Sequence, residues 1–221
     1  MPILGFDTST AASTAAVLLP DGRAVESIAP PGRLLERPAH AAELLPAIHD
    51  VMERAGLSFA DLDAIAVGRG PGTFTGLRIG VATARALAKA SGLPLRGVSS
   101  LAALAAGMPE GLRLPLIDAK RAEAYGALLD GDAERWPPFA LGAEALVERL
   151  RGAGVLPLAA GDGSLRFRDE LEAAGVPVAP GESPLHVVSA AHLCRLALRA
   201  PDAAPEQIVP DYLREPDAIP R

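Results

Sequence analysis

The chain has 221 residues, with 21 lysine and arginine residues against 27 aspartate and glutamate residues, giving a formal net charge of −6. This length allows one or two compact domains with a sizeable core. One cysteine excludes an intramolecular disulfide framework and a zinc site built from several thiolates. The acidic balance argues against independent binding to nucleic acid, because neutralisation of phosphates dominates such affinity. With no basic leader and no long apolar run, we expect a cytoplasmic protein that does not cross a membrane.

Three strands separated by two turns are predicted in the first thirty residues. Residues 3–6 form a short apolar run, and residues 14–19 and 23–28 are the second and third candidate strands. The first turn contains the cluster Asp7-Thr8-Ser9-Thr10, and the second is Pro20-Asp21-Gly22. The pattern predicts a β-hairpin meander whose first turn is rich in hydroxyl groups.

A helix is predicted from residue 39 to residue 55, because apolar side chains recur there every three or four positions. These side chains are Ala41, Leu44, Leu45, Ile48, Met52 and Ala55. Gly56 is a natural residue to end the helix, and Pro46 is expected to kink it or to adjust its first turns. A buried strand is predicted next, at residues 62–67.

The segment from Gly68 to Gly80, with the sequence GRGPGTFTGLRIG, leads into a second helix that ends near Ser91. It lacks the Gly-Lys-Ser/Thr ending of a Walker A motif, and its glycine spacing does not fit the dinucleotide fingerprint. Four small residues recur along the helix at every fourth position, and they are Gly76, Gly80, Ala84 and Ala88. A stripe of small side chains lets a second helix approach closely.

A second α/β unit is predicted after Val98. Its strands are expected at residues 112–117, 122–129 and 155–160, and its helices at 100–106, 143–151 and 166–174. A closing helix is expected after this unit, at residues 189–200. Residues 118–125 are interpreted as a charged hairpin in preference to a binding edge. The first lobe is expected to comprise residues 1–98 and about 186–204, the second lobe residues 99–185, and an extended tail residues 205–221.

Two segments are candidates for weak nucleotide or phosphate binding. The candidate residues are Asp7, Thr8, Ser9, Thr10, Gly70 and Gly72. The first four could hold a magnesium-phosphate group through a carboxylate and hydroxyls, and the glycine loop could present amides to an anion. The competing interpretations are a hairpin turn satisfied by its own side chains and a tight turn from strand to helix.

The histidines and the cysteine do not form a catalytic pattern. His40 and His49 fall on roughly opposite faces of their helix, and His186 and His192 do not share a face either. We therefore expect no metal site built on paired histidines, and the sequence assigns no residue as catalytic. Cys194 is interpreted as a buried, inert thiol.

Several motifs resemble the TsaB (YeaZ) family, in the family's order from one end of the chain to the other. They are Ile3 to Thr10, His40 with Leu44-Leu45-Pro46, Gly68 to Gly80, Ile117-Asp118-Ala119 with Glu123 and Tyr125, and Pro210 to Arg214. That family belongs to the actin-like ATPase superfamily. The resemblance therefore implies an α/β fold of two related actin-like (ribonuclease H-like) lobes with mixed sheets and flanking helices, and the two predicted units agree with it.

The resemblance also implies a function in tRNA modification. In that pathway TsaD, the catalytic paralogue, transfers a threonylcarbamoyl group to adenosine 37 of tRNAs that read codons starting with adenosine. This chain would be a non-catalytic subunit that dimerises with TsaD, works with the ATPase TsaE, and meets tRNA only through the complex. It would need no cofactor itself, while ATP or ADP and magnesium would act in the complex. The H-x-x-x-H metal motif of TsaD is broken here, because Leu44 stands at the position of the second histidine, four residues after His40.

The family pairs through helices of its first lobe, and a homodimer is a further expectation. The expected partner residues are His40, Leu44, Leu45, Ile48, Gly76, Leu77, Gly80, Val81 and Ala84. The small ones would allow close approach, so replacing Gly80 and Ala84 with leucine should break the complex while the isolated fold persists. The alternatives are an autonomous ATP-binding enzyme of the actin or sugar-kinase kind, and a metallopeptidase, which the histidine pattern disfavours.

Overall fold

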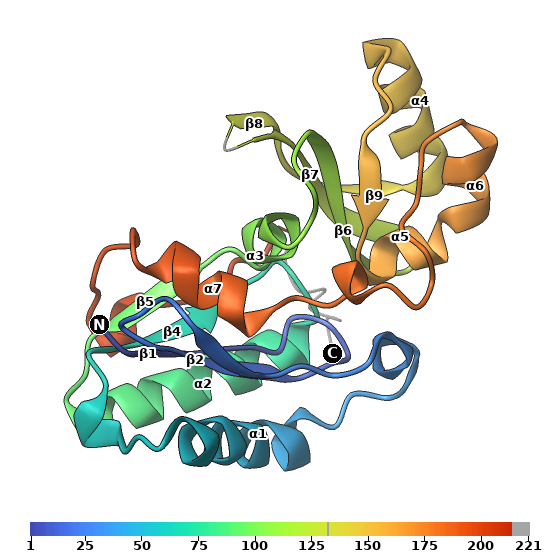
Figure 1. Cartoon of the computed structure of the whole chain (residues 1–221). Helices are drawn as coiled ribbons and strands as arrows, with labels where there is room; N and C mark the ends of the chain where they lie inside the picture. The colour runs from blue at the N-terminus through green and yellow to red at the C-terminus, as the bar shows by residue number, and fades with distance from the viewer. Residues whose placement is uncertain (132, 214–221) are drawn as a thin grey trace, which may run out of the picture.

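Two lobes, each built on its own mixed sheet, make up the described part of the chain (Figure 1). The structure is a computed structural model that describes residues 1–131 and 133–213. The first sheet has the strand order β3-β2-β1-β4-β5. Its strands are β1 (Ile3–Asp7), β2 (Thr14–Leu18), β3 (Ala24–Ser27), β4 (Ala64–Gly68) and β5 (Leu95–Val98). The first four confirm the predicted strands, whereas β5 is not predicted, because Arg96 and Gly97 interrupt its apolar pattern.

The four strands of the second sheet repeat the order and directions of the strands β3, β2, β1 and β4 in the first sheet. The order in this second sheet is β8-β7-β6-β9. Its strands are β6 (Leu112–Lys120), β7 (Glu123–Asp130), β8 (Ala133–Gly142) and β9 (Leu158–Ala160). In each sheet the central strand, β1 or β6, pairs antiparallel with the next strand and parallel with a later one. The predicted fold class, α/β with two related lobes, mixed sheets and flanking helices, is confirmed.

The strand β8 is not predicted by the sequence, and its prolines explain why. Pro137 and Pro138 interrupt the alternation that identifies a strand, and they remove two backbone donors. The strand lies at the edge of the sheet and pairs only with β7 among the described strands. Proline is tolerated at such an edge, because one side of the strand needs no partner.

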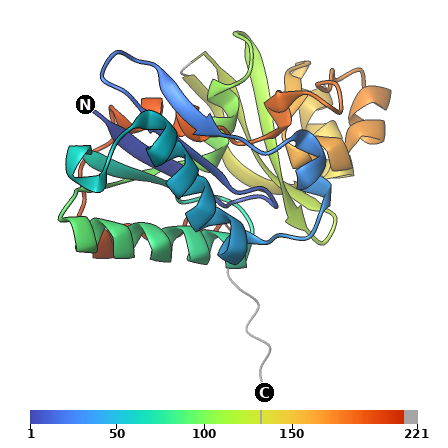
Figure 2. The same cartoon turned by 60° about the horizontal axis from the view of Figure 1, so that its bottom comes forward.

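Helices cover both faces of the first sheet (Figures 1 and 2). They are α1 (His40–Ala55), α2 (Phe74–Ser91) and α7 (Ala190–Ala197). Side chains alternate along β1, so that Leu4 and Phe6 pack in the core beneath α1 and α2, whereas Ile3 packs in the core with α7. The two long predicted helices are confirmed, while the last one is shorter than the predicted range 189–200.

The contact between β1 and α7 depends on a glycine. A Cβ atom at position 5 would overlap the sulfur of Cys194, so only Gly5 lets the helix lie this close to the strand. The thiol is fully buried, and burial raises its pKa to about 12. Cys194 is therefore the buried, inert thiol that the sequence predicts.

Short helices complete the second lobe and the connections. They are α3 (Ser100–Ala106), α4 (Ala143–Ala153), α5 (Asp162–Arg166) and α6 (Arg168–Ala173), with 3-10 turns at Pro31–Leu35, Phe59–Asp61, Pro184–His186 and Pro205–Gln207. The helix predicted at residues 166–174 is confirmed by α6, whereas α5 is not predicted. The two helices meet at Phe167, which leaves the helical conformation. Helix α3 packs against both α7 and β6 and so links the lobes.

Within the described ranges, every helix is too short or too polar to cross a membrane.

The tail lies along α2 as far as the structure describes it. The guanidinium group of Arg85 donates to the carbonyl of Ile208 at 2.9 Å, and Ala203 forms a bridge with Leu95 in the edge strand β5. The tail predicted at residues 205–221 contains one 3-10 turn, and its last part, residues 214–221, lies outside the described residues.

The stripe of small residues on α2 faces inward, not toward a partner. A Cβ atom at position 76 would overlap the carbonyl oxygen of Thr8, and one at position 80 would overlap the Thr8 hydroxyl. These glycines therefore let α2 approach the turn after β1 within the same chain. Both Gly80 and Ala84 are buried within this lobe, so we expect a Gly80→Leu, Ala84→Leu variant to lose stability, instead of keeping its fold as the sequence led us to expect.

Gly76→Ala is expected to destabilise the protein by about 2 kcal/mol, because the backbone of Thr8 cannot give way to the added methyl group. The control is Gly152→Ala in α4, where an added Cβ meets no atom within 4 Å, and whose stability should stay equal or rise slightly. Chemical denaturation measures both. Equal stability of the two variants would contradict the packing described for α2.

Candidate functional site

A cleft of about 700 Å³ opens between the two lobes. Its first wall is formed by residues 38–42 at the start of α1 and residues 72–76 at the start of α2. Its second wall is the hairpin between β6 and β7, with residues 118–121, and Tyr212 of the tail lines it as well. A concave site of this volume is in the range of small-molecule sites, so the cleft is the candidate functional site.

Asp7 ends β1, and its buried carboxylate is fully engaged by the chain itself. Oδ1 accepts hydrogen bonds from the amide and the hydroxyl of Ser9, at 2.8 and 2.6 Å. Oδ2 accepts from the hydroxyl of Ser100 at 2.6 Å, and a Cβ atom on Gly68 would overlap this oxygen. Burial raises the pKa of Asp7, while the hydrogen bonds from the two serines lower it.

The other hydroxyls of the predicted phosphate site also bond within the chain. Thr8 Oγ1 donates to the carbonyl of Gly76 at 2.8 Å, which fastens the turn after β1 to α2. Thr10 Oγ1 accepts from the amide of Ala12 at 3.3 Å. The hydroxyls in this turn are therefore used in its own structure, as the competing interpretation from the sequence holds.

The glycine loop packs directly on that turn. The amide of Gly70 donates to the hydroxyl of Ser100 at 3.2 Å, and a Cβ atom on Gly72 would lie 2.5 Å from Ser9 Cβ. The structure thus brings all six predicted residues together, as a close junction between two loops. Phosphate binding by this junction stays a prediction.

His40 lies at the start of α1, with 3% of its surface exposed, and it lines the cleft. Its Nδ1 is 2.8 Å from the hydroxyl of Ser13, while Nε2 has no hydrogen-bond partner within the described chain. Burial lowers the pKa of His40, and the nearby charge of Asp7 opposes that shift. The hydroxyl of Thr73, at the start of α2, is likewise buried without a partner.

The surroundings of His40 do not fit a metal ion. Leu44, one turn further along α1, is buried in the core and offers no ligand atom. Among residues 1–131 and 133–213, no group of three or more histidine, cysteine, aspartate or glutamate side chains is arranged to hold a metal.

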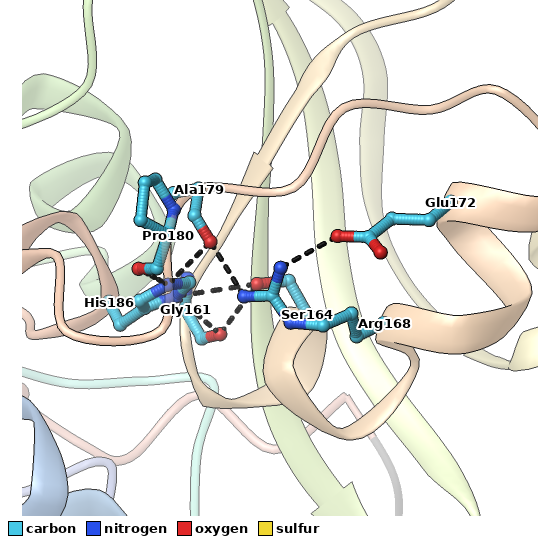
Figure 3. Close-up of polar contacts among 7 residues, drawn as sticks. All are labelled: Gly161, Ser164, Arg168, Glu172, Ala179, Pro180 and His186. Carbon is cyan, nitrogen blue, oxygen red and sulfur yellow. Dashed lines mark hydrogen bonds and ion pairs between the residues drawn. The ribbon is translucent and has the colours of Figure 1, made fainter.

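His186 is buried in the second lobe, away from the cleft residues, and its ring holds chain segments together (Figure 3). Nε2 lies 3.2 and 3.0 Å from the carbonyls of Ala179 and Pro180, so this nitrogen carries a hydrogen. Nδ1 then accepts from the amide of Gly161 at 3.1 Å. Arg168 donates to the same Ala179 carbonyl at 2.7 Å. The cluster fixes the segment 179–186 against α5 and α6.

Two aspartates meet where the second sheet reaches the cleft. Asp118 accepts from Lys120 Nζ at 2.8 Å and from Arg166 Nη1 at 3.1 Å, so its charge is balanced by two cations. The amide of Asp118 donates to Oδ1 of Asp162 at 2.9 Å. Burial raises the pKa of Asp162 to about 6, with Asp118 adding to the shift. Asp162 is not evident as a site residue from the sequence, because it lies just after β9 in a segment interpreted as a connection.

The hairpin between β6 and β7 confirms the interpretation of residues 118–125 as a charged hairpin. Its tip turns through Lys120, Arg121 and Ala122, which all have positive φ angles near 60° although none is glycine. The same hairpin forms a wall of the cleft. The second interpretation, a binding edge, therefore stays open.

An aromatic pair stands at the start of α2 and lines the cleft. The rings of Phe74 and Tyr212 are 5.5 Å apart, and both side chains are more than a third exposed. The guanidinium group of Arg78 lies 3.7 Å from the Phe74 ring centroid, and its Nε donates to the Tyr212 hydroxyl at 3.2 Å. This pair is not evident from the sequence, because Phe74 and Tyr212 are far apart in the chain.

The expected partner residues are almost all occupied by the fold itself. Of the nine, only Leu45 is exposed, at 55%. The others are buried, and they are His40, Leu44, Ile48, Gly76, Leu77, Gly80, Val81 and Ala84. The spacing identified the apolar sides of both helices correctly, but those sides face the sheet. Pairing through these helices stays a prediction and would have to use their outward sides.

Asp162→Asn is expected to flatten the dependence of stability on pH. The folded pKa of about 6 exceeds the ordinary 3.8, so the folded state holds the proton more tightly and stability falls as pH rises between these values. At neutral pH the free energy of unfolding of the variant should exceed that of the wild type by about 1 kcal/mol, which is part of the free energy that the pKa shift of Asp162 represents. Denaturation curves across this pH range test it, with the exposed Asp169→Asn as control. Parallel curves for wild type and Asp162→Asn would contradict the assignment.

Comparison with known proteins agrees with these features. Residues 35–136 match the family model described as "TsaD: tRNA N6-adenosine threonylcarbamoyltransferase". The tRNA threonylcarbamoyladenosine biosynthesis protein TsaB of Escherichia coli is 40% identical over 131 residues, which are 58% of this chain and 54% of that protein. The alignment thus spans about half the length of this relative.

Solved structures match over nearly the whole chain. A Pseudomonas aeruginosa protein described as similar to peptidase YeaZ has a TM-score of 0.78 and 30% identity, covering 96% of this chain and 99% of that one. YeaZ from Pseudomonas aeruginosa has a TM-score of 0.75 and 29% identity, covering 96% and 100%. With this agreement in sequence and fold along the full solved chains, the protein belongs to the TsaB (YeaZ) family.

Proposed function

We propose that this chain is a non-catalytic subunit in the biosynthesis of threonylcarbamoyladenosine in tRNA, and that it acts by dimerising with a TsaD-type transferase. The observation that carries the proposal is membership of the TsaB family, whose Escherichia coli member is named for this pathway. The match of residues 35–136 to the TsaD family model adds support, because paralogues with a shared fold are natural partners.

The chemistry of the cleft, and of the loop junction around Asp7, supports a non-catalytic role. The carboxylate of Asp7 is held by Ser9 and Ser100, and that of Asp118 by Lys120 and Arg166. Both carboxylates thus accept several hydrogen bonds from the chain itself, which is the arrangement expected of groups that hold the fold together. His40 also lacks a neighbouring ligand at Leu44.

The outward side of α1 is the docking surface that we propose for the partner. Leu45 projects there beside a groove of about 400 Å³ between α1, the following turn and α2. Its apolar lining comprises Leu45, Ile48, Met52, Leu57, Phe59 and Leu87. Buried apolar side chains dominate the binding energy of protein interfaces, and a second actin-like lobe would bring a helix face of matching kind.

The rest of the proposed assembly follows from the family resemblance. TsaE would join the complex, tRNA would be bound only through it, and ATP or ADP with magnesium would act at the level of the complex. The subunit itself would need no cofactor, would be cytoplasmic, and could also form a homodimer through the same face of α1.

An autonomous ATP-binding enzyme is the alternative function. Thermal denaturation of the isolated protein with ATP and magnesium separates the two. A large rise in melting temperature together with ATP hydrolysis would favour the enzyme, whereas a subunit without catalysis should show no turnover on its own. Peptide hydrolysis by the isolated protein would instead support a peptidase.

Leu45→Asp is expected to weaken binding to TsaD at least about tenfold, because a charge would be buried in an apolar interface. The fold should persist, since the side chain is 55% exposed. The matched control is Leu198→Asp, at 50% exposure beyond α7 on the opposite side of the sheet, and it should bind normally. Co-purification and calorimetry measure both. Unchanged binding by Leu45→Asp would remove α1 from the interface.

Reconstituted tRNA modification tests the role of the subunit itself. TsaD, TsaE and the enzyme that makes the threonylcarbamoyl donor are incubated with tRNA, with and without this chain. We expect modified adenosine only when the chain is present, and a loss of product with Leu45→Asp that added protein partly restores. Full modification without the chain would overturn the scaffold proposal.

A further inference from the structure

Residues 203–213 cross the first lobe as a strap, from the edge of its sheet to the mouth of the cleft. At one end, Ala203 and Leu95 in the edge strand β5 exchange two backbone hydrogen bonds, at 3.0 and 3.4 Å. At the other end, Tyr212 lines the cleft beside the start of α2. The strap forms no helix or strand apart from the 3-10 turn at Pro205–Gln207, so its position depends on the groups that it contacts.

Two polar contacts tie the strap to α2 and to the glycine loop. The guanidinium group of Arg85, within α2, donates to the carbonyl of Ile208 at 2.9 Å. The amide of Asp211 donates to the carbonyl of Arg69, at the start of the glycine loop, at 2.6 Å. A Cβ atom on Gly70 would lie 3.1 Å from the Asp211 carbonyl oxygen, so the strap lies directly on this loop. The strap thus holds the segment that leads into α2.

A single side chain anchors the strap in the core. Ile208 is 6% exposed and is the only buried residue of the strap. It lies against β5, where a Cβ atom on Gly97 would be 3.2 Å from its Cδ1. The ion pair of Arg69 with Asp211 spans 3.8 Å between side chains that are both more than 40% exposed, so it adds little. A segment with so few buried apolar contacts can open locally while the rest of its lobe stays folded.

The attached strap forms part of the cleft. Tyr212 contributes to the cleft lining, and its ring lies 5.5 Å from that of Phe74, the first residue of α2. The Arg69 carbonyl that the strap engages belongs to the loop that continues into residues 72–76, the first wall of the cleft. Release of the strap would therefore remove Tyr212 from the lining and leave the loop without this backbone hydrogen bond.

We propose that residues 203–213 are a detachable strap. Attached, the strap completes the mouth of the cleft and holds the glycine loop and the start of α2. Released, it opens that mouth and loosens both segments. The contacts that hold it lie in the first lobe, so its release leaves the second lobe unchanged. This device goes beyond the proposed function, because it concerns access to the cleft and needs no partner protein.

Hydrogen exchange of the full-length protein, measured by mass spectrometry, tests the proposal with Arg85→Met. This variant removes the three hydrogen bonds that Arg85 donates to carbonyls of the strap, and it keeps an unbranched apolar side chain on α2. We expect exchange at residues 203–213 and 69–77 to become at least about tenfold faster, with the second lobe unchanged. The control is Lys89→Met, one turn further along α2 and exposed, which should exchange like the wild type.

Ile208→Ala and Val209→Ala supply a second matched pair at neighbouring positions. Ile208 is buried, whereas Val209 is 51% exposed, so only Ile208→Ala should give the exchange pattern of Arg85→Met. Faster exchange of the strap alone, with residues 69–77 unchanged, would overturn the proposal, because the strap would then hold nothing in place. Faster exchange throughout both lobes, or no change in either Arg85→Met or Ile208→Ala, would overturn it as well.

Discussion

The buried carboxylate of Asp7 is the contact on which the junction of the two lobes depends. A carboxylate can be buried only if hydrogen bonds replace its water, and here Ser9 and Ser100 supply them. Ser100 is the first residue of α3, the helix that packs against α7 in one lobe and β6 in the other. Gly68, at the end of β4, leaves the space that the carboxylate fills. One side chain thus fastens three segments that are distant in the sequence.

That junction also explains what the sequence can and cannot predict. The long helices and the first strands follow from apolar spacing, since each buries one face, and the spacing was sufficient to place α1 and α2 within a residue or two. The same spacing does not show which surface packs against the buried face of a helix. The small residues of α2 are therefore predicted to contact a partner, whereas in the structure Gly76 and Gly80 pack against Thr8 of the same chain.

The relation between the lobes was predictable only from family resemblance. Four strands of the first sheet and the four strands of the second share their order and directions. The connections differ, because a turn of polar residues follows β1, whereas a hairpin whose tip residues have positive φ angles follows β6. The strand β8 also contains two prolines. With these differences, the two lobes show no repeat in sequence. In the site, the residues that the sequence predicts do lie together around Asp7. Spacing alone cannot show that their hydroxyls are hydrogen-bonded within the chain. Nor can it show that His40 Nε2 and Thr73 Oγ1 lack partners among the described residues.

The close packing of Gly5 on Cys194 has a practical consequence for studying the protein in solution. The chain has one cysteine, and with a thiol pKa of about 12 it is scarcely ionised at neutral pH and shielded from reagents. A cysteine introduced on the surface would therefore be the one readily labelled thiol in the molecule. Spin labels, fluorophores or cross-linkers can be attached at a chosen position while the natural cysteine stays in place, undisturbed in the core.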